Sequence, residues 1–529
     1  MPLQKNLFKI VQSPYSQIIF VTILGALLRF YNIGLQPLWI DEAFSFRFSQ
    51  FPLSQLWGAE AVNEPNPPLY YTLLKIWIFL FGDSEIALRS LPAFFGVLTI
   101  PLLYFIGRTL GDHKLGIIAA TLLAFSPINI QYSQETRAYT LLTVSVTLAI
   151  LGLAKLSQNP EGSKVPIGKV LIQDLFSKDS AKIKNQVNLD IYIAWFSYVF
   201  GLCLAFYAHS TAVFLILITN IFALIYWINS LSFNKIFVKN WIVVNTFILV
   251  IWAWWLTVVL RQTGANSWIP FTTFTDSLSV LSSVLIEPSR EQDYVLQIFK
   301  YTLFLCLLIL GLWKWRNNLK IFTLVNLFLI GFPFLCFIVS FSRPLFIPRV
   351  FLWTTVPFYL LIASGISAFR SRFISIFLLT IILTFQIRGT LNYYETFKKE
   401  PWNQVANYIA SHSKQGDTII MLSTYFSVPF NYYFRKSSIN LNQYGLVKDY
   451  SDKKYSELNQ VSELKLGDIN TATSSSNHVF FIRGHMSHSS EFKDISLSVT
   501  STLSEHMNQV DHFNKELEVL TFESSVKSL

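Results

Sequence analysis

Residues 18–30 (IIFVTILGALLRF) form an apolar segment, and residues 37–43 (PLWIDEA) follow it closely. With its flanks, the segment is long enough to enter a lipid bilayer. Two adjacent carboxylates, Asp41 and Glu42, therefore lie just beyond a predicted membrane span. Charge at the edge of a membrane is unfavourable unless it is solvated or used, so this pair predicts a functional site. A solvated loop end is the alternative that the spacing leaves open.

The composition indicates a polytopic membrane protein. Of the 529 residues, 52% are hydrophobic and only 14% are charged, which is more apolar than a soluble core of this size requires. The formal charge of +10 comes from Lys and Arg in short loops between apolar runs, a pattern that favours contact with membrane lipids over nucleic acid. The three cysteines lie inside apolar runs without metal-ligand spacing, so they predict neither disulfides nor a zinc site.

Apolar runs long enough to cross the bilayer predict an α-helical protein with about 11 transmembrane helices. A further run, residues 69–81, is too short to cross, contains Lys75 and follows Pro67-Pro68, so it predicts a surface or re-entrant helix. No small-residue cleavage site follows the first run, which is predicted to be an uncleaved span. The predicted spans lie near residues 16–35, 89–107, 115–130, 138–155, 191–208, 211–229, 241–260, 296–313, 321–340, 350–369 and 373–390.

The distribution of Lys and Arg predicts the orientation. If residues 69–81 do not cross, most basic residues of the loops, including those of the Lys-rich loop 155–184, fall on one side of the membrane. A crossing at 69–81 would reverse this bias. Because cytoplasmic loops collect Lys and Arg, the N-terminus is predicted to be cytoplasmic in the inner (plasma) membrane. Residues 36–88 then form one long external loop that carries the acidic pair and surface helices.

Two domains are predicted, a transmembrane domain over residues 1–391 and an extracytoplasmic α/β domain over residues 392–529. Beyond the last apolar run, an amphipathic stretch from Pro401 to His412 predicts a helix, and residues 416–417 predict a turn. Short apolar runs over 418–422 and 478–484 predict strands. The Ser-, Asn- and Lys-rich stretches 440–476 and 485–510 are predicted to be loops and edges.

With this orientation, the unusual polar residues gather on the external side, as a one-sided active site would require. The alternative is structural: the external loops are longer and therefore contain more residue types. Glu64 and Asn66 precede a double proline that fixes the backbone, and they would line an acceptor cavity. The external candidates are Asp41, Glu42, Glu64, Asn66, Gln134, Glu135, Arg137, His209, Arg343 and Arg349.

Each of these candidates also has a structural interpretation. Gln134 and Arg137 would share a face if a helix begins there, and otherwise they are polar caps of a helix end. His209, between two spans, is either a site residue or a hydrogen-bonded interfacial histidine. Arg343 and Arg349 bracket a short external loop, where they would meet a lipid phosphate or reach ordinary headgroups.

Four motifs carry a resemblance to a known family. Residues 38–43 (LWIDEA), 66–71 (NPPLYY), 81–89 (FGDSEIALR) and 132–139 (YSQETRAY) occur in this order. They resemble the bacterial protein-mannosyltransferase-like and aminoarabinose-transferase-like families of the glycosyltransferase C superfamily, integral membrane enzymes that use polyprenyl-phosphate-linked sugars. The resemblance covers about the first 150 residues. It extends to Arg349, although Val350 stands where relatives usually have tyrosine, and the tail with Pro401-Trp402 resembles their external domain.

The resemblance implies a reaction and roles for the residues. Sugar transfer from a phosphate-linked lipid to a lipid, glycan or protein acceptor requires a base for the acceptor and cations for the departing phosphate. Asp41 would be the base, and Glu42 would orient the acceptor or hold a divalent ion. Tyr139 and the residues of its motif would bind substrate, and transfer would invert the anomeric centre. No cofactor is required beyond such an ion.

Three other classes stay open, and one of them is a purely structural membrane protein, in which Asp41 would be dispensable. A transporter or channel would show internal repeats, broken helices near the midplane and charges within spans. A lipid-linked glycan ligase or polymerase would share the topology and the donor but should lack the early acidic pair. The polar residues collect at the ends of the spans, and the acidic pair is present, so the sequence favours the glycosyltransferase.

Overall fold

The computed structural model shows a mostly helical chain that packs as two compact units. The first unit comprises Met1–Ile33 and Pro52–Phe397, and the second comprises Gly34–Phe51 and Lys398–Leu529. The acidic pair therefore belongs, by packing, to the same unit as the C-terminal residues. The predicted domain boundary at residues 391/392 stays a prediction. The structure describes residues 13–58, 64–158, 182–228, 235–261, 272–286, 294–446, 461–474, 476–484, 490–514 and 517–524.

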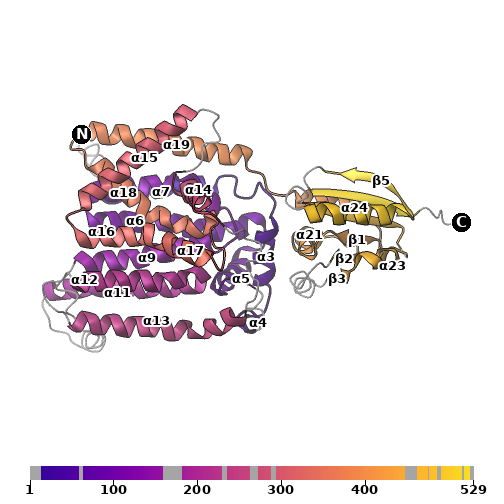
Figure 1. Cartoon of the computed structure of the whole chain (residues 1–529), viewed down its shortest axis with the longest axis horizontal. Helices are drawn as coiled ribbons and strands as arrows, with labels where there is room; N and C mark the ends of the chain where they lie inside the picture. Colours follow the sequence, from indigo (N-terminus) through magenta and orange to yellow (C-terminus); the bar gives the residue numbers. More distant parts are fainter. Residues whose placement is uncertain are drawn as a thin grey trace, which may run out of the picture. The chain divides into compact units, whose positions relative to one another are not determined.

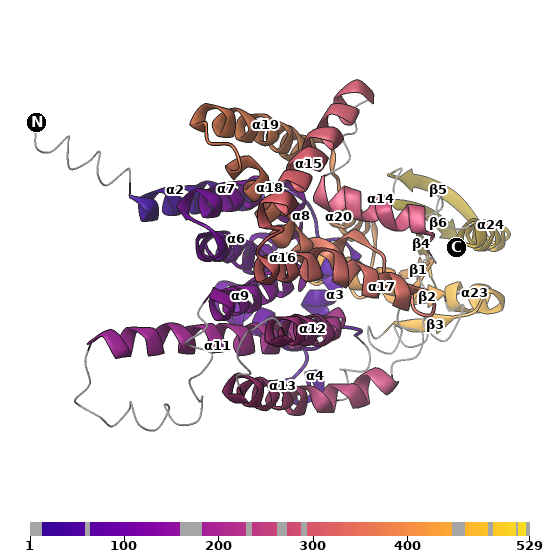
Figure 2. The same ribbon diagram turned by 60° about the vertical axis from the view of Figure 1, so that its left-hand side comes forward.

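The first unit consists of helices, many of which run along a common direction (Figure 1). α9 and α11 lie side by side in Figure 1 and in Figure 2 because small residues permit close approach. A Cβ atom added at Gly201 would lie 2.5 Å from the Ala149 nitrogen. The helices are α2 (Pro14–Phe30), α4 (Leu53–Leu56), α5 (Leu69–Phe81), α6 (Glu85–Leu110), α7 (His113–Ala124), α8 (Pro127–Ser133), α9 (Tyr139–Gln158), α11 (Lys182–Ala208), η3 (Ser210–Val213), α12 (Phe214–Ile228), α13 (Lys235–Arg261), α14 (Phe274–Leu285), α15 (Tyr294–Trp315), α16 (Leu319–Asn326), the π-helical turn η4 (Leu327–Gly331), α17 (Phe332–Ser340), η5 (Pro348–Thr354), α18 (Thr355–Ser367) and α19 (Arg372–Thr396).

The predicted fold class, a polytopic α-helical membrane protein, is confirmed. Within the described residues, 9 segments are long and apolar enough to cross a membrane, and α7 with α8, bent by 59°, would make a tenth. The remaining predicted span, near 16–35, falls on α2, which has 17 residues. The short helix predicted over 69–81 is α5, which begins after Pro68 and ends at Gly82, whose φ of 81° stops the helix.

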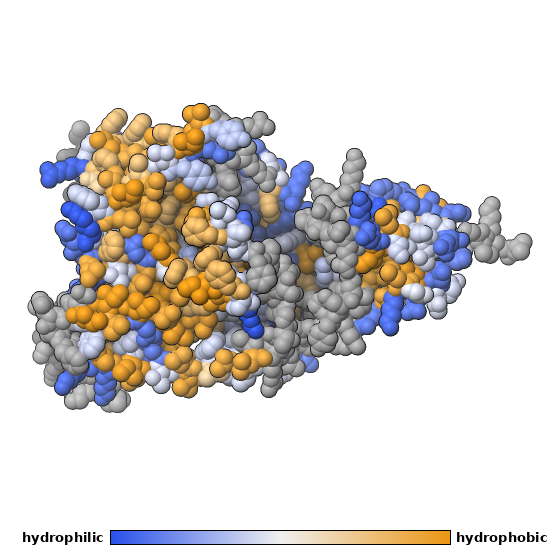
Figure 3. All heavy atoms as spheres, in the orientation of Figure 1, coloured by the Kyte–Doolittle hydropathy of each residue, from blue (hydrophilic) through white to orange (hydrophobic). Residues whose placement is uncertain are grey.

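The surface of the first unit carries the apolar side chains that a lipid environment requires. Figure 3 shows hydrophobic residues gathered over its helices, whereas the surface of the C-terminal domain is mostly hydrophilic or intermediate. Among the exposed large apolar residues of the helical unit are Phe79, Val250, Leu260 and Phe373. Helices that are apolar all round and yet exposed are typical of membrane spans.

The second unit is built around a six-stranded sheet with the strand order β3-β2-β1-β4-β6-β5. β3, β2, β1 and β4 are parallel, and β6 and β5 are antiparallel to their neighbours. Every residue of the central β1 is buried, so both faces of the sheet are covered there. The elements are α3 (Ile40–Ser49), α20 (Trp402–His412), β1 (Thr418–Met421), η6 (Thr424–Phe426), α21 (Ser427–Phe434), β2 (Asn442–Leu446), β3 (Ser462–Leu464), η7 (Leu466–Asp468), α23 (Ile469–Thr473), β4 (His478–Gly484), α24 (Ser490–Ser504), β5 (Met507–Phe513) and β6 (Leu517–Ser524).

This arrangement confirms the predicted small α/β domain. α20, β1 and β4 fall where the sequence predicts them, and Gly416 (φ 87°) forms the predicted turn before β1. The prediction that residues 485–510 form loops and edges is wrong, because α24 occupies much of this stretch. Its Val499 and Leu503, four residues apart, are buried in the domain core.

Candidate functional site

The predicted site residues divide between the two units. Asp41 and Glu42 lie on α3 in the second unit, and all the other candidates lie in the first unit. Within the first unit, three side chains lie against the ring of Tyr139 and a carboxylate pairs with one of them; we call these five residues the Tyr139 cluster. Its members are Glu64, Arg137, Tyr139, His209 and Arg349.

The Tyr139 cluster brings two guanidinium groups to the same ring. Tyr139 is the first residue of α9, and the guanidinium carbons of Arg137 and Arg349 lie 5.9 Å and 5.8 Å from its ring centroid. The His209 ring lies 6.1 Å away, between centroids. Cations within about 6 Å of an aromatic face are attracted to it, which helps to hold both arginines in place. Four segments that are distant in the sequence thus deliver charged or polar groups to one location.

Glu64 balances part of this positive charge. Its Oε1 atom lies 4.0 Å from a terminal nitrogen of Arg137, and it accepts hydrogen bonds from the backbone N–H (3.3 Å) and the side-chain amide (3.0 Å) of Asn66. Tyr71, on α5, also hydrogen-bonds to Glu64. Burial raises the pKa of this phenol, which therefore keeps its proton and donates a hydrogen bond to the carboxylate. With one carboxylate for two guanidiniums, the described charges of the cluster are net positive.

His209 is held in one neutral tautomer. It lies between α11 and η3, where its Nδ1 accepts from the backbone N–H of Thr211 (3.3 Å) and lies 2.9 Å from the Thr211 hydroxyl. Because Nδ1 is an acceptor, the proton resides on Nε2. Burial, together with the positive charges of Arg137 and Arg349, lowers the pKa of His209 to about 3. The imidazole is therefore a neutral hydrogen-bond donor at physiological pH.

This depressed pKa predicts that acid destabilises the helical unit. In the unfolded chain His209 titrates near 6.5, so between pH 6.5 and about 3 the unfolded state binds a proton that the folded state does not. The free energy of unfolding should then fall as pH falls through this window, by up to about 1.4 kcal/mol per pH unit. Thermal unfolding of the detergent-purified protein between pH 7 and pH 4 measures this slope. His209→Asn should flatten the slope, and a variant with the same slope would contradict the assignment.

Gln134 does not join the Tyr139 cluster. The condition for a shared helical face is not met, because α8 ends at Ser133 and α9 begins at Tyr139. The Gln134 amide instead donates to the carbonyls of Arg29 (3.0 Å) and Tyr31 (2.7 Å) and accepts from the Tyr393 hydroxyl (3.1 Å). Its observed contacts therefore join the end of α2 to α19, and its role in substrate binding stays a prediction.

The structure also separates the remaining candidates of the first unit. Glu135 is buried and lies two residues before Arg137 in the sequence. Its backbone carbonyl accepts a hydrogen bond from the Arg137 N–H (2.6 Å). Arg343 is exposed after α17, whereas Arg349 is partly buried on η5. Val350, which replaces the expected tyrosine, is buried. The two arginines that bracket the loop thus occupy different environments.

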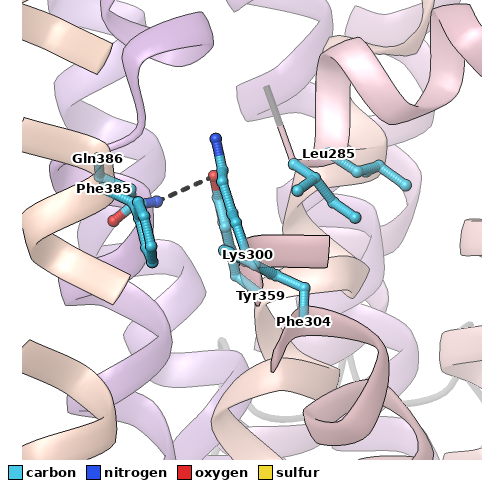
Figure 4. A pocket seen from close by; sticks show the side chains of 7 residues that line it. Leu285, Lys300, Phe304, Tyr359, Phe385 and Gln386 are labelled. Carbon is cyan, nitrogen blue, oxygen red and sulfur yellow. Dashed lines mark hydrogen bonds between the residues drawn. The ribbon is translucent and has the colours of Figure 1, made fainter. Parts of the chain in front are cut away.

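Two further polar residues of the first unit, Tyr71 and Lys300, were not predicted as site residues. Tyr71 stands within the quoted motif 66–71, which was the available signal. Lys300 is buried within the span α15, and a cation inside a span is itself a signal of function. Figure 4 shows Lys300 beside Tyr359 and Gln386, whose amide donates to the tyrosine hydroxyl (3.2 Å). No member of the Tyr139 cluster lines this small cavity, so the two sites are distinct.

In the second unit, the acidic pair opens α3. The Glu42 carboxylate reaches back to the Trp39 backbone N–H (3.5 Å), and Glu42 Oε2 accepts from Lys399 Nζ at 2.9 Å. Lys399 was not predicted, because it lies 357 residues away in the sequence. Within the described residues, no three His, Cys, Asp or Glu side chains are grouped to hold a metal ion. An ammonium at this oxygen also disfavours a divalent ion there, and the metal role of Glu42 stays a prediction.

Sequence comparison matches part of the chain to a known protein family. Residues 65–170 match the family described as dolichyl-phosphate-mannose-protein mannosyltransferase. An uncharacterized protein of Aquifex aeolicus (strain VF5) is 25% identical in an alignment of 189 positions, which covers 30% of this chain and 38% of that protein. The chain thus matches well under half the length of this curated relative.

Structural comparison extends the similarity to the whole chain. The crystal structure of ArnT from Cupriavidus metallidurans bound to undecaprenyl phosphate is similar over 96% of this chain and 98% of that chain, with 11% identity and a TM-score of 0.59. An oligosaccharyltransferase of Archaeoglobus fulgidus, tethered to an acceptor peptide, is similar over 98% of this chain and 75% of that chain, with 9% identity and a TM-score of 0.51. At these identities the likeness shows the fold. Together with the family match over residues 65–170, it confirms the predicted resemblance to the glycosyltransferase C superfamily.

Proposed function

We propose that this multi-pass membrane protein is a glycosyltransferase that moves one sugar from a polyprenyl-phosphate-linked donor to an acceptor. The observation that carries the proposal is the Tyr139 cluster, where Arg137 and Arg349 flank one ring next to a neutral His209. Its net positive charge suits a lipid-linked phosphate. The fold shared with ArnT, a protein crystallised with undecaprenyl phosphate, supports a lipid carrier of the polyprenyl-phosphate class.

The proposed reaction assigns one base and two phosphate-stabilising cations. Asp41 takes a proton from the acceptor hydroxyl or amine, whose oxygen or nitrogen then bonds to the anomeric carbon of the sugar. The bond between that carbon and the phosphate oxygen breaks, and the configuration inverts. The electron pair goes to the leaving phosphate, whose negative charge is stabilised by Arg137 and Arg349. Tyr139, Glu64 and Asn66 would bind the sugar or the acceptor beside these arginines.

The orientation and the substrates complete the proposal. We infer that the N-terminus is cytoplasmic and that transfer occurs at the extracytoplasmic face of the inner membrane, because the basic residues gather in the loops assigned to the cytoplasm. The transferred sugar would be a hexose or a pentose, and the acceptor a lipid, a glycan or a protein.

One experiment tests both the reaction and the side of the membrane. Glycolipids, glycans and glycoproteins are compared by mass spectrometry between cells with the wild-type chain and cells with an equally abundant Asp41→Asn chain. We expect one glycosylated product to be lost in the variant cells. In intact wild-type cells, that product should react with a membrane-impermeant label for sugars. Identical products would contradict the transferase, and a product that is labelled only after the cells are opened would contradict the orientation.

A further inference from the structure

The acidic helix α3 is held by the C-terminal domain. The Leu38 backbone N–H donates to the Tyr433 hydroxyl (2.7 Å), and the ring of Phe46 packs edge-on against Tyr432 with centroids 5.1 Å apart. The Arg435 guanidinium covers Phe46 at 4.8 Å from its ring centroid. All these partners lie on α21 or directly after it. α3 is therefore anchored by a domain that begins more than three hundred residues later in the chain.

Lys399 makes the buried, charged attachment of this segment. Its Nζ lies 2.9 Å from Glu42 Oε2, and the exposed fractions of the two side chains are 3% and 0%. Its backbone N–H donates to Gln36 Oε1 at 3.1 Å. One residue thus holds the segment that leads into α3 and the first turn of α3. A lysine and a carboxylate buried to this degree persist only as a pair, because either alone would be an uncompensated charge.

Asp41 lies inside the segment that Lys399 holds. It directly precedes Glu42, and its carbonyl accepts from the Ser45 hydroxyl (3.1 Å) within α3. Fixing the Glu42 carboxylate restrains the first turn of α3, and with it the backbone from which the Asp41 side chain projects. A base must be placed accurately to act, and a small displacement reduces the rate strongly.

We propose that Lys399 is a positioning residue for Asp41 and that Glu42 acts through this lysine rather than on the acceptor or a metal ion. The C-terminal domain would thereby set the geometry of the base. The inference rests on the proposed function. It adds to that function only how the base is held in place.

The test is a charge exchange in the full-length protein. Lys399→Met should lower kcat about 10- to 100-fold with an unchanged KM for the donor, because the base is misplaced while the phosphate contacts persist. Glu42→Lys and Lys399→Glu should each be at least as impaired. The double variant Glu42→Lys with Lys399→Glu restores a buried pair and should regain at least about tenfold over either single reversal. The neighbouring, exposed Lys398 supplies the matched control Lys398→Met, which should behave as wild type.

The outcomes separate the two proposals. A double variant as inactive as Glu42→Lys would mean that Glu42 itself acts on the acceptor or a metal, and it would overturn the inference. So would a Lys399→Met enzyme as active as Lys398→Met, or one whose activity is lost only in proportion to its folded fraction, measured by thermal unfolding. A wild-type chain that transfers no sugar from polyprenyl-phosphate donors would instead overturn the proposed function.

Discussion

Asp41→Asn should lower sugar transfer by about two to four orders of magnitude, which is the contribution expected of a general base. The amide has nearly the shape of the carboxylate but cannot accept the acceptor proton. Because the substitution keeps the polar side chain on the first turn of α3, we expect normal membrane insertion and a normal unfolding temperature. The measurement is transfer from a purified polyprenyl-phosphate sugar to the acceptor identified in cells.

The control for this variant is Asp112→Asn. Asp112 is exposed and caps α7 by accepting from the Leu115 N–H at 2.8 Å. Asparagine caps helices about as well as aspartate, so the same chemical change should have little effect there. Undiminished transfer by Asp41→Asn would remove Asp41 from the role of base.

Arg349→Ala should lower kcat/KM for the donor by about 10²- to 10³-fold while changing the KM for the acceptor little. The guanidinium is proposed to contact the phosphate, which belongs to the donor alone. Arg349→Lys should recover part of the loss, because lysine keeps the charge but not the planar, paired donors of arginine. Initial rates with donor and acceptor varied in turn measure the two effects separately.

The matched control is Arg316→Ala. Arg316 is exposed at the end of α15, where its guanidinium covers Trp313 and donates to the Trp313 carbonyl (2.7 Å). Its loss should leave both kinetic constants near the wild-type values. Equal effects of Arg349→Ala on donor and acceptor would count against a phosphate contact.

Local patterns were sufficient for much of the fold. A membrane span has a continuous apolar run in its sequence, which is why each predicted span falls on one helix or on consecutive helical segments of the structure. The strand at 478–484 could also be predicted, because a buried strand is a short apolar run between polar residues. α24 was missed because its Ser- and Thr-rich sequence resembles a loop, although buried Val499 and Leu503 fall one helical turn apart.

The candidate site could be predicted only in part from the sequence. Its residue types could be found, because polar residues at the ends of spans are rare enough to stand out. Their partners could not. The Glu42–Lys399 pair joins positions 357 residues apart, and the pairing of Gln134 with Tyr393 spans 259 residues, distances over which one sequence carries no signal. The break between α8 and α9 at residues 134–138 was likewise not indicated by helix propensity.

The division of the chain into units has a consequence for biosynthesis. The polypeptide passes from the first unit to the second after Ile33, returns after Phe51, and passes again after Phe397. α3 is thus translated near the beginning, whereas Lys399 and α21 leave the ribosome near the end. Until then the helices of the first unit can enter the bilayer one after another, while α3 lacks the C-terminal residues against which it packs. A nascent chain interrupted before residue 398 would lack Lys399 and α21, so α3 would be without the partners that hold it.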